Sequence, residues 1–266
     1  MIKIGVLGVA GRMGQAIMAE IFDREGAQFA GGCDSLDHPR IGETLRHPAT
    51  GEALDLVIGN TPAELFLISD VLIDFSAPDA LEEHLVLAAG QQKPLIIGTT
   101  GLNARHHSLI DDVAQQVPIM QAANTSMGVN LLAKLVADAA AALDDSWDIE
   151  ILDMHHRAKV DAPSGTALLL GEKAAEARGQ DASAFTLSRE GNTGPRETGT
   201  IGYATLRGGD VAGEHSVIFA AGAERLELSH KATDRRIFAR GAVTAAQWIH
   251  GLPAARYTME DVLGLR

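Results

Sequence analysis

The 266-residue sequence predicts an α/β protein with a doubly wound parallel sheet first and an α+β domain with a mixed sheet second. Two observations predict this fold class. The first half alternates short apolar runs with longer stretches of helical spacing, which is the pattern of βαβ units. Beyond about Asn124–Asn130, an Ala-rich helix leads into segments that mostly alternate apolar and polar residues, as strands do.

Short apolar runs and helical stretches follow one another in the first half. The predicted strands are Ile2–Leu7, Gln28–Cys33, Val71–Phe75, Leu95–Ile97 and Pro118–Met120. The predicted helices between them are Met13–Arg24, Asp79–Gly90 and Ala104–Gln116. Right-handed crossovers would place these helices on both faces of a parallel sheet.

The second half changes from helices to strands. The predicted helices are Leu131–Leu143, Ser164–Arg178 and Ile237–Trp248. The predicted strands are Trp147–Met154, Thr200–Arg207, Glu214–Ala220 and Arg225–His230, and His155–Pro163 is predicted to be irregular. We expect residues 1–126 to form the first domain and residues 127–234 the second, with residues 235–266 returning to the first.

Glycines mark the turn after the first predicted strand. Gly8, Gly11 and Gly14 stand between this strand and the first predicted helix. Glycines there permit a tight turn, close approach of the backbone to a pyrophosphate, and close packing of helix on strand. The GxxGxxG spacing alone is a weak signal, and a glycine turn without a ligand is the alternative.

Further groups at strand ends strengthen a dinucleotide interpretation. Asp34 follows the second strand, about twenty residues after the glycines, where a carboxylate can accept hydrogen bonds from an adenosine ribose. Three later strand ends carry small or polar residues, in Phe75–Pro78, Gly98–Gly101 and Ala122–Thr125. Ligands of open α/β sheets bind at such ends, so the sequence predicts a Rossmann-type domain that binds NADH or NADPH.

The residue after Asp34 bears on the choice between the two nucleotides. A carboxylate repels a 2′-phosphate, and Ser35 supplies no adjacent cation. NADH should therefore be well accepted. Arg12 and Arg40 could still reach a 2′-phosphate, so both nucleotides stay open as cofactors.

The composition argues against some classes of partner and indicates the cellular compartment. The formal net charge of −13 opposes nucleic-acid binding, which requires a basic surface. Cys33 is the single cysteine, as expected of a chain in a reducing compartment. No apolar run approaches the ~20 residues of a membrane span, and the start does not resemble a signal peptide. We expect a cytoplasmic protein without membrane or nucleic-acid partners.

Five ionisable side chains lie between His155 and Asp161, directly before a predicted helix. Ser164 or Asp161 could cap this helix, and the N–H groups of Gly165 and Thr166 at its start suit a carboxylate. A lysine can supply a charge or a proton, and a histidine titrates near neutrality. The alternatives are structural histidines or, less favoured because further ligands lack recognisable spacing, a metal site.

The segments GVAGRMG, GTTG, AANTSMGVN and HHRAKVDAPSGTAL closely resemble the bacterial dihydrodipicolinate reductases, now called 4-hydroxy-tetrahydrodipicolinate reductases. The resemblance implies a homotetramer that reduces a cyclic dicarboxylate of lysine biosynthesis with NAD(P)H. It implies that His155 and Lys159 are catalytic and that His156, Gly165 and Thr166 bind the substrate carboxylates. The residues that would contact the dinucleotide are Gly8, Val9, Ala10, Gly11, Arg12, Met13, Asp34, Gly98, Thr99, Thr100, Ala122, Ala123, Asn124 and Thr125.

Other functions remain to be weighed against this one. A semialdehyde dehydrogenase needs a nucleophilic cysteine, and Cys33 lies beside the expected adenosine rather than the nicotinamide. A regulator that senses NAD(H) without catalysis, or a reductase of a related cyclic dicarboxylate, would share much of the pattern. We expect no resident metal ion.

Overall fold

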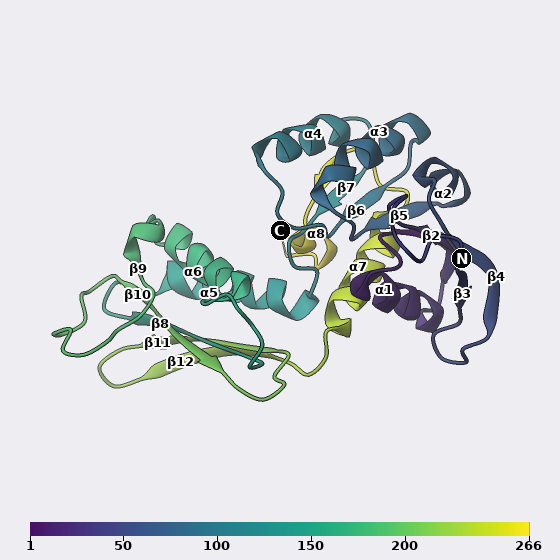
Figure 1. The fold of residues 1–266 in the computed structure, drawn as a ribbon. Coiled ribbons are helices and arrows are strands. Elements are labelled where there is room, and N and C mark those ends of the chain that lie inside the picture. The colour runs from purple at the N-terminus through teal and green to yellow at the C-terminus, as the bar shows by residue number, and fades with distance from the viewer. Residues whose placement is uncertain (266) are drawn as a thin grey trace. The chain divides into compact units, whose positions relative to one another are not determined.

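The computed structural model describes residues 1–265, which form two compact units (Figure 1). One unit comprises Met1–Met127 together with Arg236–Arg266, and the other comprises Gly128–Arg235. The C-terminal helix thus belongs to the same unit as the N-terminal strand. Each helix of the described residues is too short or too polar to cross a bilayer.

The first unit is built on an eight-stranded sheet in the order β13-β7-β6-β5-β1-β2-β4-β3. Its strands are β1 (Ile2–Leu7), β2 (Ala27–Cys33), β3 (Thr44–Arg46), β4 (Ala53–Gly59), β5 (Val71–Asp74), β6 (Leu95–Ile97), β7 (Ile119–Gln121) and β13 (Arg256–Tyr257). All neighbouring pairs are parallel except β3 and β4. The order reverses at β1, so the chain winds outward from there in both directions, as predicted.

Helices cover both faces of this sheet. They are α1 (Arg12–Asp23), α2 (Pro62–Ile68), the 3₁₀ turn η1 (Pro78–Ala80), α3 (Leu81–Gln91), α4 (Ala104–Ala114), α7 (Arg236–Ile249) and α8 (Met259–Val262). One apolar core joins α1 and α7 to one face, and a second joins α2, α3 and α4 to the other. The doubly wound arrangement follows from these two cores.

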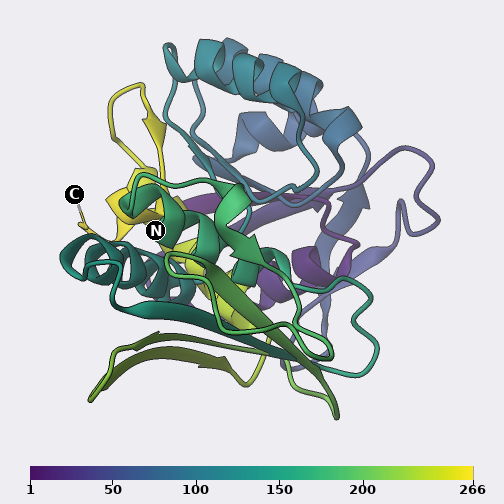
Figure 2. The same cartoon turned by 90° about the vertical axis from the view of Figure 1, so that its left-hand side faces the viewer.

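The second unit has a five-stranded mixed sheet in the order β12-β11-β8-β10-β9. Its strands are β8 (Asp148–His155), β9 (Phe185–Thr186), β10 (Ile201–Arg207), β11 (Gly213–Ala220) and β12 (Arg225–Ala232). Its helices are α5 (Met127–Ala142), α6 (Gly165–Ala177) and the 3₁₀ turn η2 (Ala182–Ala184). The helices α5 and α6 lie on one face of the sheet (Figure 2), and their apolar residues pack against it. The predicted mixed sheet is thereby confirmed.

The structure corrects the sequence-based elements in several places, and β13 and α8 are among the elements that were not predicted. Residues 44–68, for which no element was predicted, contain β3, β4 and α2. His155 was expected to open an irregular segment, but it is the last residue of β8 and pairs in register with Arg207 of β10. Because side chains alternate along a strand, this places His155 on the same buried face as Asp153.

Candidate functional site

The glycine turn between β1 and α1 is tight and is held by backbone contacts within the turn and to β2. Gly8 has a φ of +81°, which favours glycine, and the N–H groups of Gly8 and Val9 both donate to the carbonyl of Cys33. A Cβ atom on Gly14 would lie 2.2 Å from the Gly8 carbonyl oxygen. The side chain of Val9 is buried in the core, so only its backbone can face a ligand.

Asp34 braces this turn from the end of β2. Its Oδ2 accepts a 3.0 Å hydrogen bond from the Ala10 N–H, and its Oδ1 accepts one from Ser35. The guanidinium of Arg40 also reaches the turn, donating to the Ala10 carbonyl while it pairs with Glu43. A negative and a positive side chain therefore flank the same residue of the turn.

A cavity of about 530 Å³ opens beside the turn and across the carboxyl ends of the central strands. Its lining comprises Leu7, Gly8, Gly11, Cys33, Asp34, Ser35, Leu36, His38, Asn60, Pro62, Phe75, Ser76, Ala77, Ala80, Glu83 and His84. Of the predicted nucleotide residues, Gly8, Gly11 and Asp34 therefore line one cavity. Its position at the reversal of strand order is where open α/β sheets hold nucleotides.

A buried carboxylate at the end of β5 holds the neighbouring loops. Asp74 is fully buried, and its Oδ1 accepts hydrogen bonds from the N–H and hydroxyl of Ser76 and from the hydroxyl of Thr99. Its Oδ2 lies 2.7 Å from Nδ1 of His84 on α3. The predicted ligand residue Thr99 thus uses its side chain to fix the loop, while Thr100 is exposed.

The loop after β7 is fixed by α7. The hydroxyl of Thr125 donates a 2.7 Å hydrogen bond to the carbonyl of Phe238. Gly241 lies so close that a Cβ atom would approach the Thr125 carbonyl oxygen to 1.7 Å. The amide oxygen of Asn124 accepts from the N–H of Ser126. Packing of α7 therefore sets the path of Ala122–Thr125, whose Ala123 is exposed.

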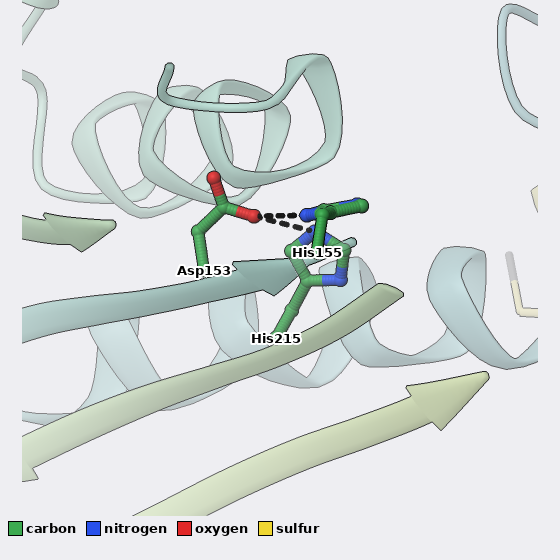
Figure 3. A group of neighbouring side chains, drawn as sticks. All are labelled: Asp153, His155 and His215. Atoms are coloured by element: carbon green, nitrogen blue, oxygen red, sulfur yellow. Dashed lines mark ion pairs between the residues drawn. The ribbon is translucent and has the colours of Figure 1, made fainter. Parts of the chain in front are cut away.

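In the second unit, His155 meets Asp153 and His215 on the buried face of the sheet (Figure 3). Nδ1 of His155 lies 2.7 Å from Oδ1 of Asp153, at ion-pair distance, although the angle is not that of a regular hydrogen bond. Burial lowers the pKa of His155, as do the charges of Lys159 and Arg207, while Asp153 opposes them. The neutral imidazole is favoured as a result.

Asp153 also binds groups outside the pair. Its Oδ2 accepts from the N–H of Ser164 at 2.8 Å and from Arg207 at 3.2 Å. Burial alone would raise the pKa of Asp153, but the Ser164 N–H, His155 and Arg207 together hold it below its ordinary value. The carboxylate is ionised at neutral pH and shared by a histidine, a helix start and an arginine.

His215 stands opposite Asp153 in the register of β11 against β8. Its Nε2 is 3.0 Å from the hydroxyl of Ser164 and 3.6 Å from Asp153 Oδ1. Burial lowers the pKa of His215 to about 4, so the ring is neutral at physiological pH. Ser164 in turn caps α6, as predicted, by accepting from the N–H of Ala167.

Three potential metal ligands meet here, on Asp153, His155 and His215. Two ligands of a tetrahedral zinc ion stand about 3.3 Å apart, given metal–ligand bonds of about 2.0–2.1 Å. The 2.7 Å between Asp153 and His155 is shorter than that spacing. This geometry is that of an acid–histidine pair.

The other predicted catalytic and substrate-binding residues follow His155 closely in the sequence. Lys159 donates a 2.7 Å bond to Asp161, and His156 Nε2 lies 3.1 Å from a guanidinium nitrogen of Arg235. A Cβ atom on Gly165 would meet nothing within 4 Å. The start of α6 is therefore open at its first residue.

Sequence reasoning missed Asp74, Asp153, Arg207 and His215. A usable signal existed for three of them: each aspartate follows apolar residues on a buried strand face, and His215 precedes Val217 and Phe219 on such a face. Polar groups at these positions require a partner, because a buried charge without one is costly. The sequence around Arg207, the last residue of β10, carries no comparable signal.

Comparison with known proteins decides the family. Two family models match, dihydrodipicolinate reductase, N-terminus, over residues 2–125 and dihydrodipicolinate reductase, C-terminus, over residues 128–263. The chain belongs to this family. The resemblance inferred from the motifs is confirmed, and the chain is a member of a family of oxidoreductases.

Full-length relatives agree with the family models. The 4-hydroxy-tetrahydrodipicolinate reductase of Zymomonas mobilis is 50% identical over 265 residues, covering 99% of this chain and 98% of the relative. That of Parvibaculum lavamentivorans is 50% identical over 269 residues, with coverage of 99% and 98%. The chain therefore matches these reductases over nearly its whole length.

Solved structures show the same fold. The dipicolinate-bound dihydrodipicolinate reductase from Paenisporosarcina sp. TG-14 has a TM-score of 0.78 at 24% identity, covering 97% of each chain. An amine dehydrogenase from Mycobacterium smegmatis has a TM-score of 0.65 at 13% identity, with coverage of 97% and 95%. The predicted fold class is confirmed.

Proposed function

We propose that this protein reduces 4-hydroxy-tetrahydrodipicolinate to tetrahydrodipicolinate with NAD(P)H, on the diaminopimelate route to lysine. The observation that carries the proposal is the 50% identity with reductases of that name over nearly the whole chain. The site adds an independent argument. An imidazole, an ammonium group and an open helix start lie within one short segment, and together they suit an anionic substrate that must receive a proton.

The first unit would bind the dinucleotide. Its phosphates would lie at the start of α1, where Arg12 and Met13 belong to the first helical turn and their N–H groups have no earlier carbonyl in the helix. Asp34 would accept from the adenosine ribose. The loops Gly98–Thr100 and Ala122–Thr125 would line the nicotinamide end. When bound, the reduced nicotinamide supplies a hydride to ring carbon C4 of the substrate, after its 4-hydroxyl has left as water.

Both NADH and NADPH fit this turn, by different contacts. The carboxylate of Asp34 favours a free 2′-hydroxyl and repels a 2′-phosphate. Arg40, whose guanidinium already contacts the Ala10 carbonyl, lies close enough to the turn to offset that repulsion. We propose that NADH is used well and that Arg40 preserves activity with NADPH.

The second unit would hold the substrate and supply the proton. His156, with the N–H groups of Gly165 and Thr166, would bind the carboxylates. Protonated Lys159 would donate the proton that balances the hydride, to the ring carbon next to the reduced one. His155, favoured as the neutral imidazole by its lowered pKa, would assist Lys159 rather than replace it.

The second sheet supports a proposed homotetramer. The face opposite α5 and α6 carries Leu152, Met154 and Ile218, which are half-buried, and Leu206, which is 46% exposed. Apolar side chains on an open sheet face favour an interface. Sedimentation equilibrium tests this assembly.

We also propose a cytoplasmic location, since the single thiol, Cys33, is buried and free.

The test is NADH oxidation with substrate generated in situ from pyruvate and aspartate semialdehyde. We expect turnover by the native protein and a loss of kcat in Lys159→Ala and His155→Gln, each with nucleotide binding retained. Binding of NADH without turnover would instead identify a redox-sensing regulator. Faster reduction of another cyclic dicarboxylate would identify a related reductase.

A further inference from the structure

The start of α6 is tied to the centre of the second sheet through one carboxylate. Asp153 Oδ2 accepts a 2.8 Å hydrogen bond from the N–H of Ser164, the N-cap residue of α6. The hydroxyl of Ser164 is held in turn by Ala167 and His215. The position of the first helical residues is therefore set from β8 and β11, and not by the preceding loop alone.

The other oxygen of the same carboxylate faces His155. Oδ1 of Asp153 and Nδ1 of His155 are both buried, and neither makes a regular hydrogen bond within residues 1–265; the closest ion-pair contact of each is with the other, at 2.7 Å. A carboxylate at Nδ1 favours the imidazole tautomer that carries its proton there. The Nε2 edge of His155 lies beside Gly213, where a Cβ atom would approach it to 3.0 Å. A glycine at this position avoids that close contact.

We infer that Asp153 is a positioning residue that fixes the ring of His155 and the start of α6 as one unit. This inference rests on the proposed function, in which His155 assists proton transfer and α6 binds a substrate carboxylate. With Nδ1 held by Asp153, Nε2 is the nitrogen that can exchange protons or hydrogen bonds with other groups. The same carboxylate keeps the anion-binding residues Gly165 and Thr166 at a fixed distance from that ring.

The effect of removing the Asp153 carboxylate on the pKa of His155 depends on the other groups that lie near the ring. They are Asp153 on its own strand, His215 on β11, Arg207 on β10 and Lys159 in the following loop. Asp153 is the one group of these that favours the imidazolium. Its replacement by asparagine should therefore lower the pKa of His155 further and move the pH profile of kcat, which a general loss of packing would not do.

The test compares Asp153→Asn with Asp148→Asn, the same change on the same strand at a half-exposed aspartate. We expect Asp153→Asn to lower kcat about 100-fold, the range of general acid–base assistance, and to raise the KM of the dicarboxylate while the Kd for NADH is unchanged. Asp148→Asn should change none of them. His155→Gln should lower kcat with a smaller effect on that KM, since it leaves Ser164 in place.

Nitrogen NMR of labelled histidine gives a readout that does not depend on turnover. The His155 resonances are assigned by their absence in His155→Gln. In the native protein the neutral ring should carry its proton on Nδ1, and in Asp153→Asn this preference should be lost. A native ring protonated on Nε2, or unchanged kinetics in a folded Asp153→Asn, would overturn the inference. Absence of turnover by the native protein would reject the proposed function instead, and the tautomer measurement would still test Asp153.

Discussion

Asp74 offers the sharpest test of how the first unit holds its ligand loops. Replacement by asparagine keeps the shape of the side chain and removes its charge. The remaining amide oxygen can still accept from Ser76 and Thr99, which share Oδ1 in the native protein. The amide nitrogen would then replace Oδ2 and present a donor to Nδ1 of His84, 2.7 Å away.

The loss of unfolding free energy in Asp74→Asn follows from the hydrogen bonds that change. A hydrogen bond to a charged group contributes about 1.5–3 kcal/mol, and a buried donor left without a partner costs about 1–3 kcal/mol. His84 can reduce the second cost by changing its tautomer and accepting from the amide. We therefore expect Asp74→Asn to lower the free energy of unfolding by about 2–4 kcal/mol, with a fall in melting temperature of about 5–15 °C.

Urea unfolding measures this difference. Trp248 packs against the core of the first unit and reports on it once Trp147, in the second unit, is replaced by phenylalanine. Asp70→Asn is the matched control, because Asp70 precedes β5 and its one side-chain bond, to the N–H of Lys3, is exposed. NADH affinity should fall in Asp74→Asn alone. Equal unfolding free energies for the two variants, within about 0.5 kcal/mol, would refute the assigned role of Asp74.

Three further outcomes are expected. The unfolded chain binds a proton at His215 below pH 6.5, whereas burial lowers the folded pKa to about 4, so acidification between these values should destabilise the fold by up to about 3 kcal/mol. His215→Gln should remove that part of the pH dependence in urea titrations, and identical slopes would contradict it. Asp34→Asn should raise the NADPH-to-NADH ratio of kcat/KM about tenfold and Arg40→Ala should lower it, as paired steady-state assays would show. Gly14→Ala should cost about 1–3 kcal/mol and weaken NADH binding, because its Cβ would strike the Gly8 carbonyl, and calorimetry with nucleotide titration measures both.

The central strands of the first sheet were predictable because an apolar core covers each face of the sheet. Strands such as Val71–Asp74 and Leu95–Ile97 are buried on both faces, so they stand out as apolar runs between helical stretches. Residues 44–68 gave no such signal. Most of β4 is half-exposed or exposed, since it lies near the edge of the sheet, and α2 has only seven residues with Leu67 exposed.

The candidate site was predictable where its residues are neighbours in the sequence. His155, Lys159 and Ser164 stand within ten positions, so their chemistry could be read as one group. The contacts of Asp153 with Arg207 and of Ser164 with His215 join residues more than fifty positions apart. Strand order and register bring them together, and neither follows from local spacing.

One rule would have recovered most of the missing residues. On β8 the buried positions are Ile149, Ile151, Asp153 and then His155, so an apolar alternation ends in a carboxylate and an imidazole without leaving the core face. Burying such groups is favourable only if each finds a partner, and the partner must come from a strand or helix packed on the same face. His215, the cross-strand neighbour of Asp153, meets that requirement. A polar residue among the buried apolar positions of a strand therefore predicts a second polar residue that is distant in the sequence. In this chain the two are Asp153 and His215, and both lie beside His155, which is proposed to assist proton transfer.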